Sequence, residues 1–405
     1  MQNNTKKQGR ITTVNVDAFR LLFKKGSNMV LFRALFTVFL LFCFNPLQAE
    51  DIPLKDKIGQ MLIIGFEGKT IDSSAPVAKA IDEHHVGGVI LYDFNDQKKK
   101  YDMNIESYAQ VTLLNRQLQQ ITHKANLKHH RPDLPLLISV DYEGGTVNRL
   151  KENYGFPPTI SQKKIGKMPL EDAEKVAKSM ADTLKTSGFN LDFAPVTDLD
   201  VNSENPIIGK QERSYSRDPL EVSKSASLFS EEFVKNGVQC AYKHFPGHGS
   251  STTDSHLGFV DVTDTWHEQE LTPYLELLSQ PIHCGVIMTA HIINRKLDPS
   301  GLPATLSPAI LTELLRHELK FDGVIVTDDI QMRAISDNYS LEETLTRTIN
   351  AGADMLLIAN QFKDTPEDPT KIIQIISDKV KQGEIPMARI NDAYRHILKL
   401  KMGLH

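Results

Sequence analysis

Eight short apolar runs recur along the chain and alternate with longer segments of helical period. The runs are Met61–Phe66, Gly88–Tyr92, Leu136–Asp141, Asn190–Val196, Val238–His244, Gly285–His291, Gly323–Asp328 and Met355–Asn360. Near-continuous Val, Ile and Leu are typical of parallel strands that are buried on both faces. Eight strand–helix repeats predict an α/β protein built as a single (β/α)8 TIM-type barrel, and a doubly wound open sheet is the alternative.

The segments between the runs carry signals for helix starts and stops. Glu171–Ser187 has a helical period and stops at Gly188, a residue type that often ends helices in the left-handed conformation. Ser307–Pro308 places a capping hydroxyl before a proline, which predicts a helix start. No Pro- or Gly-rich linker divides residues 50–405, so we expect them to form one catalytic domain.

A basic segment precedes the first run. Residues 1–49 carry seven Lys or Arg and one Asp, although the whole chain has 46 Lys plus Arg against 51 Asp plus Glu. Its apolar run, Ala34–Phe44, is shorter than the about 20 residues of a membrane span, and the small residue Ala49 follows. This pattern predicts a signal peptide at about 29–49, with an uncleaved anchor as the alternative. We therefore expect a periplasmic or secreted protein with no stable membrane insertion after cleavage.

Net charge and cysteine content exclude two further classes of protein. The formal charge of -5 offers no basic stripe, so no nucleic-acid partner is expected. Three cysteines in 405 residues exclude a disulfide scaffold. Cys240 and Cys284 lie on neighbouring predicted strands, where a disulfide could form in an oxidising compartment. Two buried thiols are the interpretation we favour.

Polar side chains stand at the ends of several predicted strands. Asp141 ends the third, Lys243 and His244 end the fifth, His291 ends the sixth and Asp328 ends the seventh. The carboxyl ends of barrel strands converge on the mouth where active sites lie. The sequence therefore predicts one polar site at this mouth.

Histidines gather in the same part of the chain, and six of the 14 lie between residues 244 and 291. A metal-dependent barrel hydrolase is one interpretation of this cluster. No HExxH motif or HxH pair supports it. Residues 243–249 also lack the glycine spacing and terminal Lys-Ser/Thr of a phosphate-binding loop. We expect neither a metal nor another cofactor.

Four stretches of sequence carry a family resemblance. They are VDYEGGTVNRL (140–150), ERSYSRDP (212–219), KHFPGHGSSTTDSH (243–256) and VIVTDDIQM (324–332). With these stretches in this order, the chain resembles the glycoside hydrolase family 3 β-N-acetylhexosaminidases. The similarity is to the single-barrel branch, which removes N-acetylglucosamine (GlcNAc) from cell-wall fragments, and it covers essentially the whole chain after the leader. KHFPGHG followed by DSH on one loop is highly specific.

The resemblance implies a role for each matching residue. Asp328 corresponds to the catalytic nucleophile, and His256 corresponds to the general acid/base with Asp254 as its partner. The residues implied to hold the terminal sugar are Asp141, Arg149, Arg213, Lys243 and His244, and those implied to line the pocket are His291 and Met332.

The residue types suit hydrolysis with retention. An aspartate can attack the anomeric carbon and form a covalent glycosyl-enzyme. A histidine titrates near neutral pH, so it can give a proton and later take one back. The resemblance thus implies an exo-acting β-N-acetylhexosaminidase that acts on GlcNAc-terminated peptidoglycan fragments or related glycans. We expect the protein to be a monomer. A β-glucosidase on the same fold and a non-catalytic cell-wall binding protein are the alternatives; the histidine loop and the filled site positions disfavour them.

The chain departs from the family pattern in two places. Many members have an acidic residue where Ser250 stands, and this difference leaves the Asp254–His256 pair intact. Gram-negative members are typically cytoplasmic, whereas this chain has the predicted leader. The leader puts a role in cell-wall recycling in doubt.

Overall fold

The computed structural model describes residues 52–101, 103–361 and 366–404. The leader and signal peptide predicted for residues 1–49 lie outside these ranges. Within them, no helix is both long enough and apolar enough to cross a membrane.

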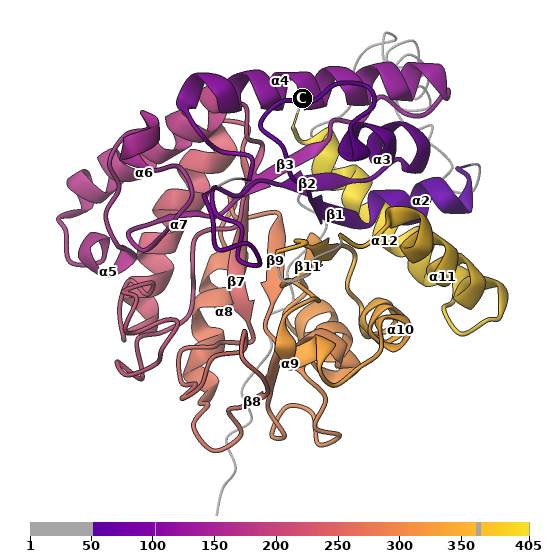
Figure 1. Ribbon diagram of the computed structural model, residues 1–405. Helices are drawn as coiled ribbons and strands as arrows, with labels where there is room; N and C mark the ends of the chain where they lie inside the picture. The colour runs from indigo at the N-terminus through magenta and orange to yellow at the C-terminus, as the bar shows by residue number, and fades with distance from the viewer. Residues whose placement is uncertain (1–51, 102, 362–365, 405) are drawn as a thin grey trace, which may run out of the picture. The chain divides into compact units, whose positions relative to one another are not determined.

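Eight parallel strands form a barrel at the centre of the domain (Figure 1). They are β1 (Leu62–Gly65), β2 (Gly88–Ile90), β3 (Leu137–Val140), β6 (Leu191–Asp192), β7 (Gln239–Phe245), β9 (Val286–Thr289), β11 (Val324–Thr327) and β12 (Leu356–Ile358). Neighbouring strands follow chain order, and β1 also pairs with β12. One parallel bridge between Val326 and Met355 joins β11 to β12 and closes the ring. The predicted (β/α)8 barrel and all eight of its strands are confirmed.

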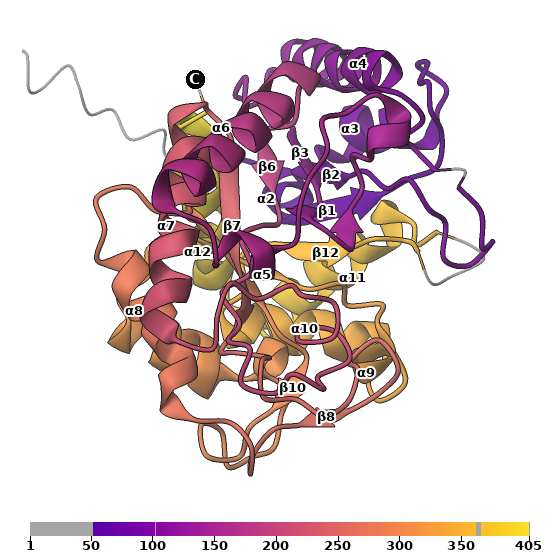
Figure 2. The same cartoon turned by 90° about the vertical axis from the view of Figure 1, so that its left-hand side faces the viewer.

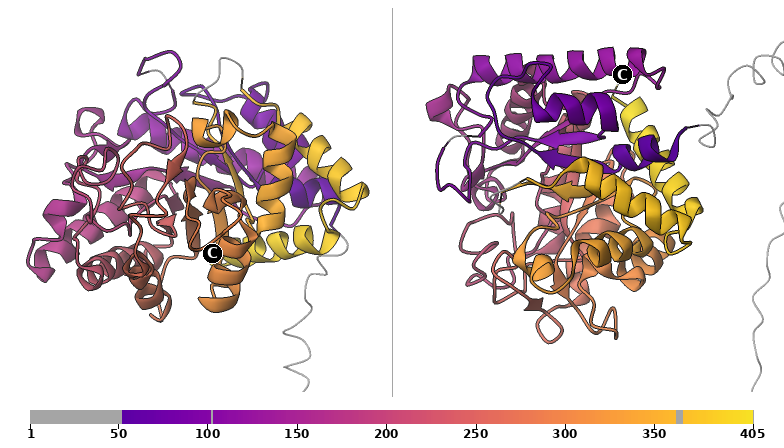
Figure 3. Two further views of the ribbon diagram at one scale, coloured as in Figure 1. Left: turned by 90° about the horizontal axis from the view of Figure 1, so that it is seen from below. Right: turned by 45° about the vertical axis from the view of Figure 1, so that its right-hand side comes forward.

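Helices surround the strands, as Figure 2 shows from the side. The α-helices are α2 (Leu54–Gln60), α3 (Pro76–His84), α4 (Tyr108–Lys128), α5 (Gln162–Ile165), α6 (Leu170–Ser187), α7 (Pro219–Lys235), α8 (Thr272–Leu278), α9 (Arg333–Ser336), α10 (Leu341–Ala351), α11 (Pro369–Lys381) and α12 (Met387–Met402). Figure 3 shows the C-terminal helices, in yellow, on the outside of the barrel. The shorter elements are the 3-10 helices η2 (Glu152–Tyr154), η3 (Glu268–Leu271) and η4 (Ala304–Leu306), the π-helix η5 (Ala309–Glu318), the hairpin of β4 (Tyr142–Gly144) with β5 (Val147–Asn148), and the pair of β8 (Val260–Asp261) with β10 (Ile292–Ile293).

The predicted helix ends are confirmed. Helix α6 ends at Gly188, whose φ of 84° is the left-handed conformation that glycine adopts without strain. The Ser307 hydroxyl accepts a hydrogen bond of 3.1 Å from the backbone N–H of Ile310 at the start of η5. The sequence signals located this helix but did not predict its π-type winding.

A buried ion-pair cluster lies at one end of the barrel, and the open mouth lies at the other. Near the amino ends of the strands, the buried Asp354 carboxylate pairs with Arg316 and Arg389 and accepts a 2.9 Å hydrogen bond from the N–H of Ile325. This cluster ties β11 to the start of β12, where the ring closes. The interiors of β3, β9 and β11 are entirely buried, so side chains fill the barrel and leave its carboxyl-end mouth for ligands.

Cys240 and Cys284 form a disulfide, so the favoured interpretation of two free thiols is wrong. Cys240 lies on β7 and Cys284 stands just before β9, and these neighbouring strands bring the two Cα atoms within 4.8 Å. The disulfide also brackets the whole segment that carries Lys243, His244 and the loop to His256.

Removing this disulfide is expected to destabilise the domain. The bond spans 44 residues, and a cross-link of that length stabilises a fold by about 2–4 kcal/mol, mainly by restricting the unfolded chain. The measurement is urea unfolding of the Cys240→Ala/Cys284→Ala variant beside the oxidised wild type. Wild type unfolded in the presence of a reductant serves as the matched control. Equal free energies of unfolding for the variant and the oxidised wild type would show that the bond contributes nothing.

Candidate active site

A cavity of about 890 Å³ opens at the carboxyl ends of the barrel strands. This volume is within the range of ligand-binding sites. Nine of the ten site residues predicted from the sequence line it: Asp141, Arg149, Arg213, Lys243, His244, Asp254, His256, Asp328 and Met332. The barrel therefore gathers side chains that lie almost 200 residues apart in the chain.

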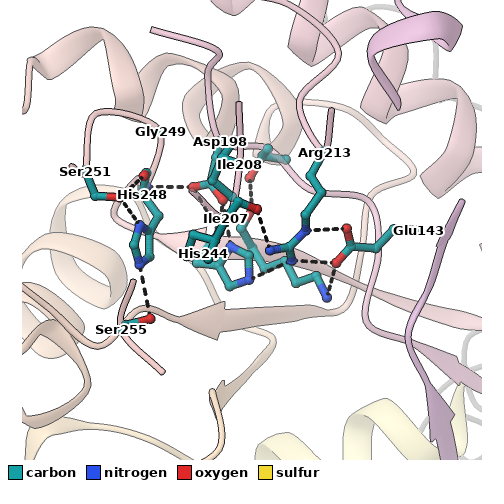
Figure 4. A network of polar contacts seen from close by, with 12 residues as sticks. Glu143, Asp198, Ile207, Ile208, Arg213, His244, His248, Gly249, Ser251 and Ser255 are labelled. Carbon is teal, nitrogen blue, oxygen red and sulfur yellow. Dashed lines mark hydrogen bonds and ion pairs between the residues drawn. The ribbon is translucent and has the colours of Figure 1, made fainter. Parts of the chain in front are cut away.

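A buried carboxylate, Glu143 on β4, holds two of the predicted sugar-binding cations. Arg213 donates two hydrogen bonds of 2.7 Å to Glu143, one from Nε to Oε2 and one from Nη2 to Oε1, as Figure 4 shows. The ammonium of Lys243 lies 2.7 Å from the same carboxylate. Burial alone would raise the pKa of Glu143, but Arg213 and Lys243 outweigh it and lower the pKa to about 2. Glu143 is thus charged, and it fixes both cations before any ligand enters.

Asp141, at the end of β3, presents its carboxylate to the cavity between two cations. Lys243 Nζ donates a 3.0 Å hydrogen bond to Asp141 Oδ1, and Arg149 Nη2 lies 3.9 Å from Oδ2. The Arg149 guanidinium also lies 5.3 Å from the centre of the Tyr92 ring, a cation–π contact. A carboxylate with fixed donors on both sides is suited to bind neighbouring hydroxyl groups.

His244, on β7, has its ring held on both sides. Its Nδ1–H donates a 2.6 Å hydrogen bond to the buried Asp198, and its Nε2 lies 3.4 Å from Nη2 of Arg213 (Figure 4). Because Nδ1 faces a carboxylate, we assign the ring proton to Nδ1. His244 is therefore fixed in one tautomer and one orientation at the cavity wall.

Two adjacent aspartates follow β11 and differ in charge. Burial alone would raise the pKa of Asp328, but His291, His244 and His256 lower it to about 2. Burial raises the pKa of Asp329 to about 7, against hydrogen bonds from backbone N–H groups. Neighbouring carboxyl groups with separated pKa values take different roles. Asp328 is the one that is fully ionised at neutral pH, as a nucleophile must be.

His291 and Met332 lie at different depths. Met332 lines the cavity, as the resemblance implied. His291 lies behind the wall, where its Nδ1 is 2.8 Å from Thr305 Oγ1 and its Nε2 is 2.9 Å from the carbonyl oxygen of Asp329. The structure thus places His291 as a buried neighbour of the aspartate pair rather than as a lining residue.

His256 and Asp254 lie on the loop between β7 and β8. The Nδ1–H of His256 donates a 2.7 Å hydrogen bond to Asp254 Oδ1, and the His256 backbone N–H donates to the same oxygen at 2.8 Å. Burial alone would lower the pKa of His256, but the Asp254 hydrogen bond and the charge of Asp328 raise it. The raised pKa favours the protonated ring, which is the form that a general acid needs.

A fold and a cavity of this kind match a known family. The model of the glycosyl hydrolase family 3 N-terminal domain matches residues 53–400. The chain belongs to this family.

Relatives in the family include β-hexosaminidases and a β-N-acetylglucosaminidase, which confirms the family resemblance. β-Hexosaminidase A of Pseudoalteromonas piscicida is 30% identical over 392 residues, which cover 88% of this chain and 62% of that protein. β-Hexosaminidase LpqI of Mycobacterium tuberculosis is 29% identical, with 86% and 82% covered. The family 3 β-N-acetylglucosaminidase structure from Paenibacillus sp. str. FPU-7 has a TM-score of 0.76 at 32% identity, with 87% and 63% covered. The chain thus spans less than two thirds of the first and the last of these proteins.

Three residues of this family 3 site went unnoticed in the sequence: Glu143, Asp198 and His248. Glu143 could have been found, because two adjacent buried cations need a buried carboxylate and Glu143 stands in the VDYEGG stretch. Asp198 lies 46 residues before His244 and has no local signal. His248 is a motif residue to which the sequence analysis assigned no role.

The histidine cluster that raised the metal hypothesis is divided among separate partners. His244 faces Asp198, His256 faces Asp254 and His291 faces Thr305. Among the residues that the structure describes, no group of three or more His, Cys, Asp or Glu side chains is placed to hold a metal ion.

Proposed function

We propose that the protein is a retaining, exo-acting β-N-acetylhexosaminidase that hydrolyses terminal, non-reducing β-linked GlcNAc. The observation that carries the proposal is that Asp328 and the hydrogen-bonded Asp254–His256 pair line one cavity at the barrel mouth. An ionised carboxylate and a histidine that can give a proton and take one back are the two groups that this reaction needs. The family and the names of its relatives support the same reaction.

In the proposed first step, an oxygen of Asp328 attacks the anomeric carbon. The bond to the leaving group breaks as His256 gives its Nε2 proton to the glycosidic oxygen. The product is a covalent glycosyl-enzyme and a free alcohol. In the second step, neutral His256 takes a proton from water, and the oxygen of that water displaces Asp328 from the anomeric carbon. Two inversions at one carbon give net retention.

The proposed sugar site combines paired charges with a neutral ligand. Asp141, Lys243 and Arg213 are held by one another and by Glu143, so their orientation costs little when the sugar binds. Buried polar groups of this kind discriminate against a sugar that leaves them unpaired. We infer that they recognise the hydroxyl pattern of the terminal residue.

Rates on two chromogenic substrates test the reaction class. We expect 4-nitrophenyl β-N-acetylglucosaminide to be hydrolysed with a higher kcat/KM than 4-nitrophenyl β-glucoside. The first sugar product, followed by NMR, should be the β-anomer. A faster reaction with the glucoside would favour the β-glucosidase alternative, and an initial α-anomer would exclude retention.

We further propose that the enzyme is exported and acts as a monomer on GlcNAc-terminated peptidoglycan fragments or related glycans. Disulfides persist mainly in oxidising compartments, and the Cys240–Cys284 bond therefore supports export. The substrate test is product analysis on purified peptidoglycan fragments beside chitobiose. N-terminal sequencing of the exported protein tests the leader, and an intact residue 1–49 segment on a cytoplasmic protein would contradict export.

A further inference from the structure

We propose that His248 and Ser255 act as a positioning pair that holds the loop carrying His256 over the cavity. The inference rests on the proposed function, because it concerns the group to which we assign the proton transfer. Neither residue is needed for the chemistry itself. Through their hydrogen bonds, Asp198 at the proposed sugar site is linked to His248, and His248 is linked to Ser255, which directly precedes His256.

His248 is anchored to the barrel through its backbone. His248 is 2% exposed, and its backbone N–H donates a 2.7 Å hydrogen bond to Asp198 Oδ1. The same carboxylate holds the ring of His244, as Figure 4 shows. Asn205 Nδ2 donates a 2.8 Å hydrogen bond to the carbonyl oxygen of His248. Both backbone polar groups of His248 are thus fixed.

The imidazole of His248 lies between two serine hydroxyls. Its Nδ1 is 2.8 Å from Ser251 Oγ, and its Nε2 is 3.3 Å from Ser255 Oγ. The Ser251 hydroxyl donates to the His248 carbonyl at 3.1 Å, so it accepts the proton of Nδ1. Burial lowers the pKa of His248 to about 4, so the ring is neutral and Nε2 is an acceptor. Ser255 therefore donates its hydroxyl proton to Nε2.

Ser255 is held from a second side by the helix that follows the proposed nucleophile in the chain. Its carbonyl oxygen accepts a 3.3 Å hydrogen bond from the N–H of Ala334 on α9, the helix that follows β11 and Asp328. Ser255 is 2% exposed, whereas the side chain of His256, the next residue, is 44% exposed. A buried residue beside a half-exposed one fixes the backbone from which the His256 ring projects.

A positioning role makes a prediction that a purely structural role does not. Small misplacement of a proton donor slows only the steps in which the proton moves. A sugar leaving group needs the proton of His256, whereas 2,4-dinitrophenolate is stable enough to depart without it. The parameter kcat/KM covers the steps up to formation of the glycosyl-enzyme, so comparing it on two substrates isolates the acid role of His256.

The experiment measures kcat/KM of Ser255→Ala on chitobiose and on 2,4-dinitrophenyl β-N-acetylglucosaminide. Losing one hydrogen bond should lower the chitobiose value about tenfold. The dinitrophenyl value should stay within about twofold of wild type. Thr253→Ala removes an exposed hydroxyl from the same loop, and we expect it to keep the wild-type ratio of the two values.

Three outcomes would overturn the proposal. Equal losses on both substrates, or no loss on either, would show that Ser255 does not position the acid. The double variant His248→Gln/Ser255→Ala should have a kcat/KM on chitobiose no lower than that of the slower single variant. If the losses of the two single variants multiply instead, the two residues act independently. Thermal melting confirms that each variant folds. A wild-type enzyme inactive on both substrates would instead refute the proposed function.

Discussion

Asp328→Ala is expected to lower kcat/KM on 4-nitrophenyl β-N-acetylglucosaminide at least about a thousandfold, which corresponds to about 4 kcal/mol of transition-state stabilisation. Burial alone would raise the pKa of Asp328, but the nearby histidines lower it to about 2, so the carboxylate is ionised and ready to attack at any pH near neutrality. Without it, water must attack directly. The remaining sugar contacts bind the substrate but cannot replace the covalent step.

A control and a rescue separate loss of the nucleophile from loss of the fold. Asp322 is an exposed carboxylate just before the amino end of β11, at the other end of the barrel from Asp328. Asp322→Ala should therefore keep wild-type activity. Azide is small enough to occupy the space left by the Asp328 carboxylate. With 2,4-dinitrophenyl β-N-acetylglucosaminide, the variant should then form the α-glycosyl azide. A β-azide, or a variant with near-normal hydrolysis, would remove Asp328 from the nucleophile role.

The fold could be predicted because the residue pattern of the barrel strands shows that they are buried. Runs such as Leu136–Asp141 and Gly323–Asp328 have consecutive apolar residues without a regular polar alternation, which is typical of strands buried on both faces. The polar residues at the ends of four of these runs then located the mouth. The π-type winding of η5 was not predicted, because it depends on how the helix packs rather than on its start signal.

The candidate site was predicted as a set of residues but not as a set of contacts. The resemblance implied that Arg213 and Lys243 hold the terminal sugar, but it gave no sign that both are themselves held by Glu143. Which carboxylate faces which cation is decided by the barrel closing, because Arg213 and Glu143 lie 70 residues apart. The disulfide was misjudged for the same reason, since adjacency of strands does not give the distance between two side chains.

These pairings explain how an acidic protein can keep cations in the proposed site for a neutral sugar. Burying a charge without a partner costs several kcal/mol. Here Glu143 neutralises part of the charge of Arg213 and Lys243. Asp141, which lines the cavity, forms a second ion pair with Lys243. The sugar therefore meets fixed donors and acceptors rather than mobile charges.

His256→Ala is expected to lower kcat/KM on chitobiose about a hundred- to ten-thousandfold, the range of a lost general acid. The kcat/KM on the 2,4-dinitrophenyl substrate should fall far less, because its leaving group departs without a proton. The general acid works when protonated, so wild-type kcat/KM should fall as pH rises through the pKa of His256. That pKa is raised because the Asp254 hydrogen bond and the Asp328 charge outweigh burial. The alkaline limb should therefore lie at a higher pH than the pKa of an unperturbed histidine, and it should vanish in His256→Ala.

Asp254→Asn tests the cause of that raised pKa. The asparagine oxygen can still accept from Nδ1–H, but it carries no charge to stabilise the imidazolium. The alkaline limb should therefore move to lower pH, while the acid limb, set by Asp328, stays far below neutrality. His267, an exposed histidine beyond the loop, is the matched control, and His267→Ala should leave the profile unchanged. An alkaline limb that stays in place in Asp254→Asn would mean that Asp254 only orients the ring, and one that persists in His256→Ala would assign the proton to another group.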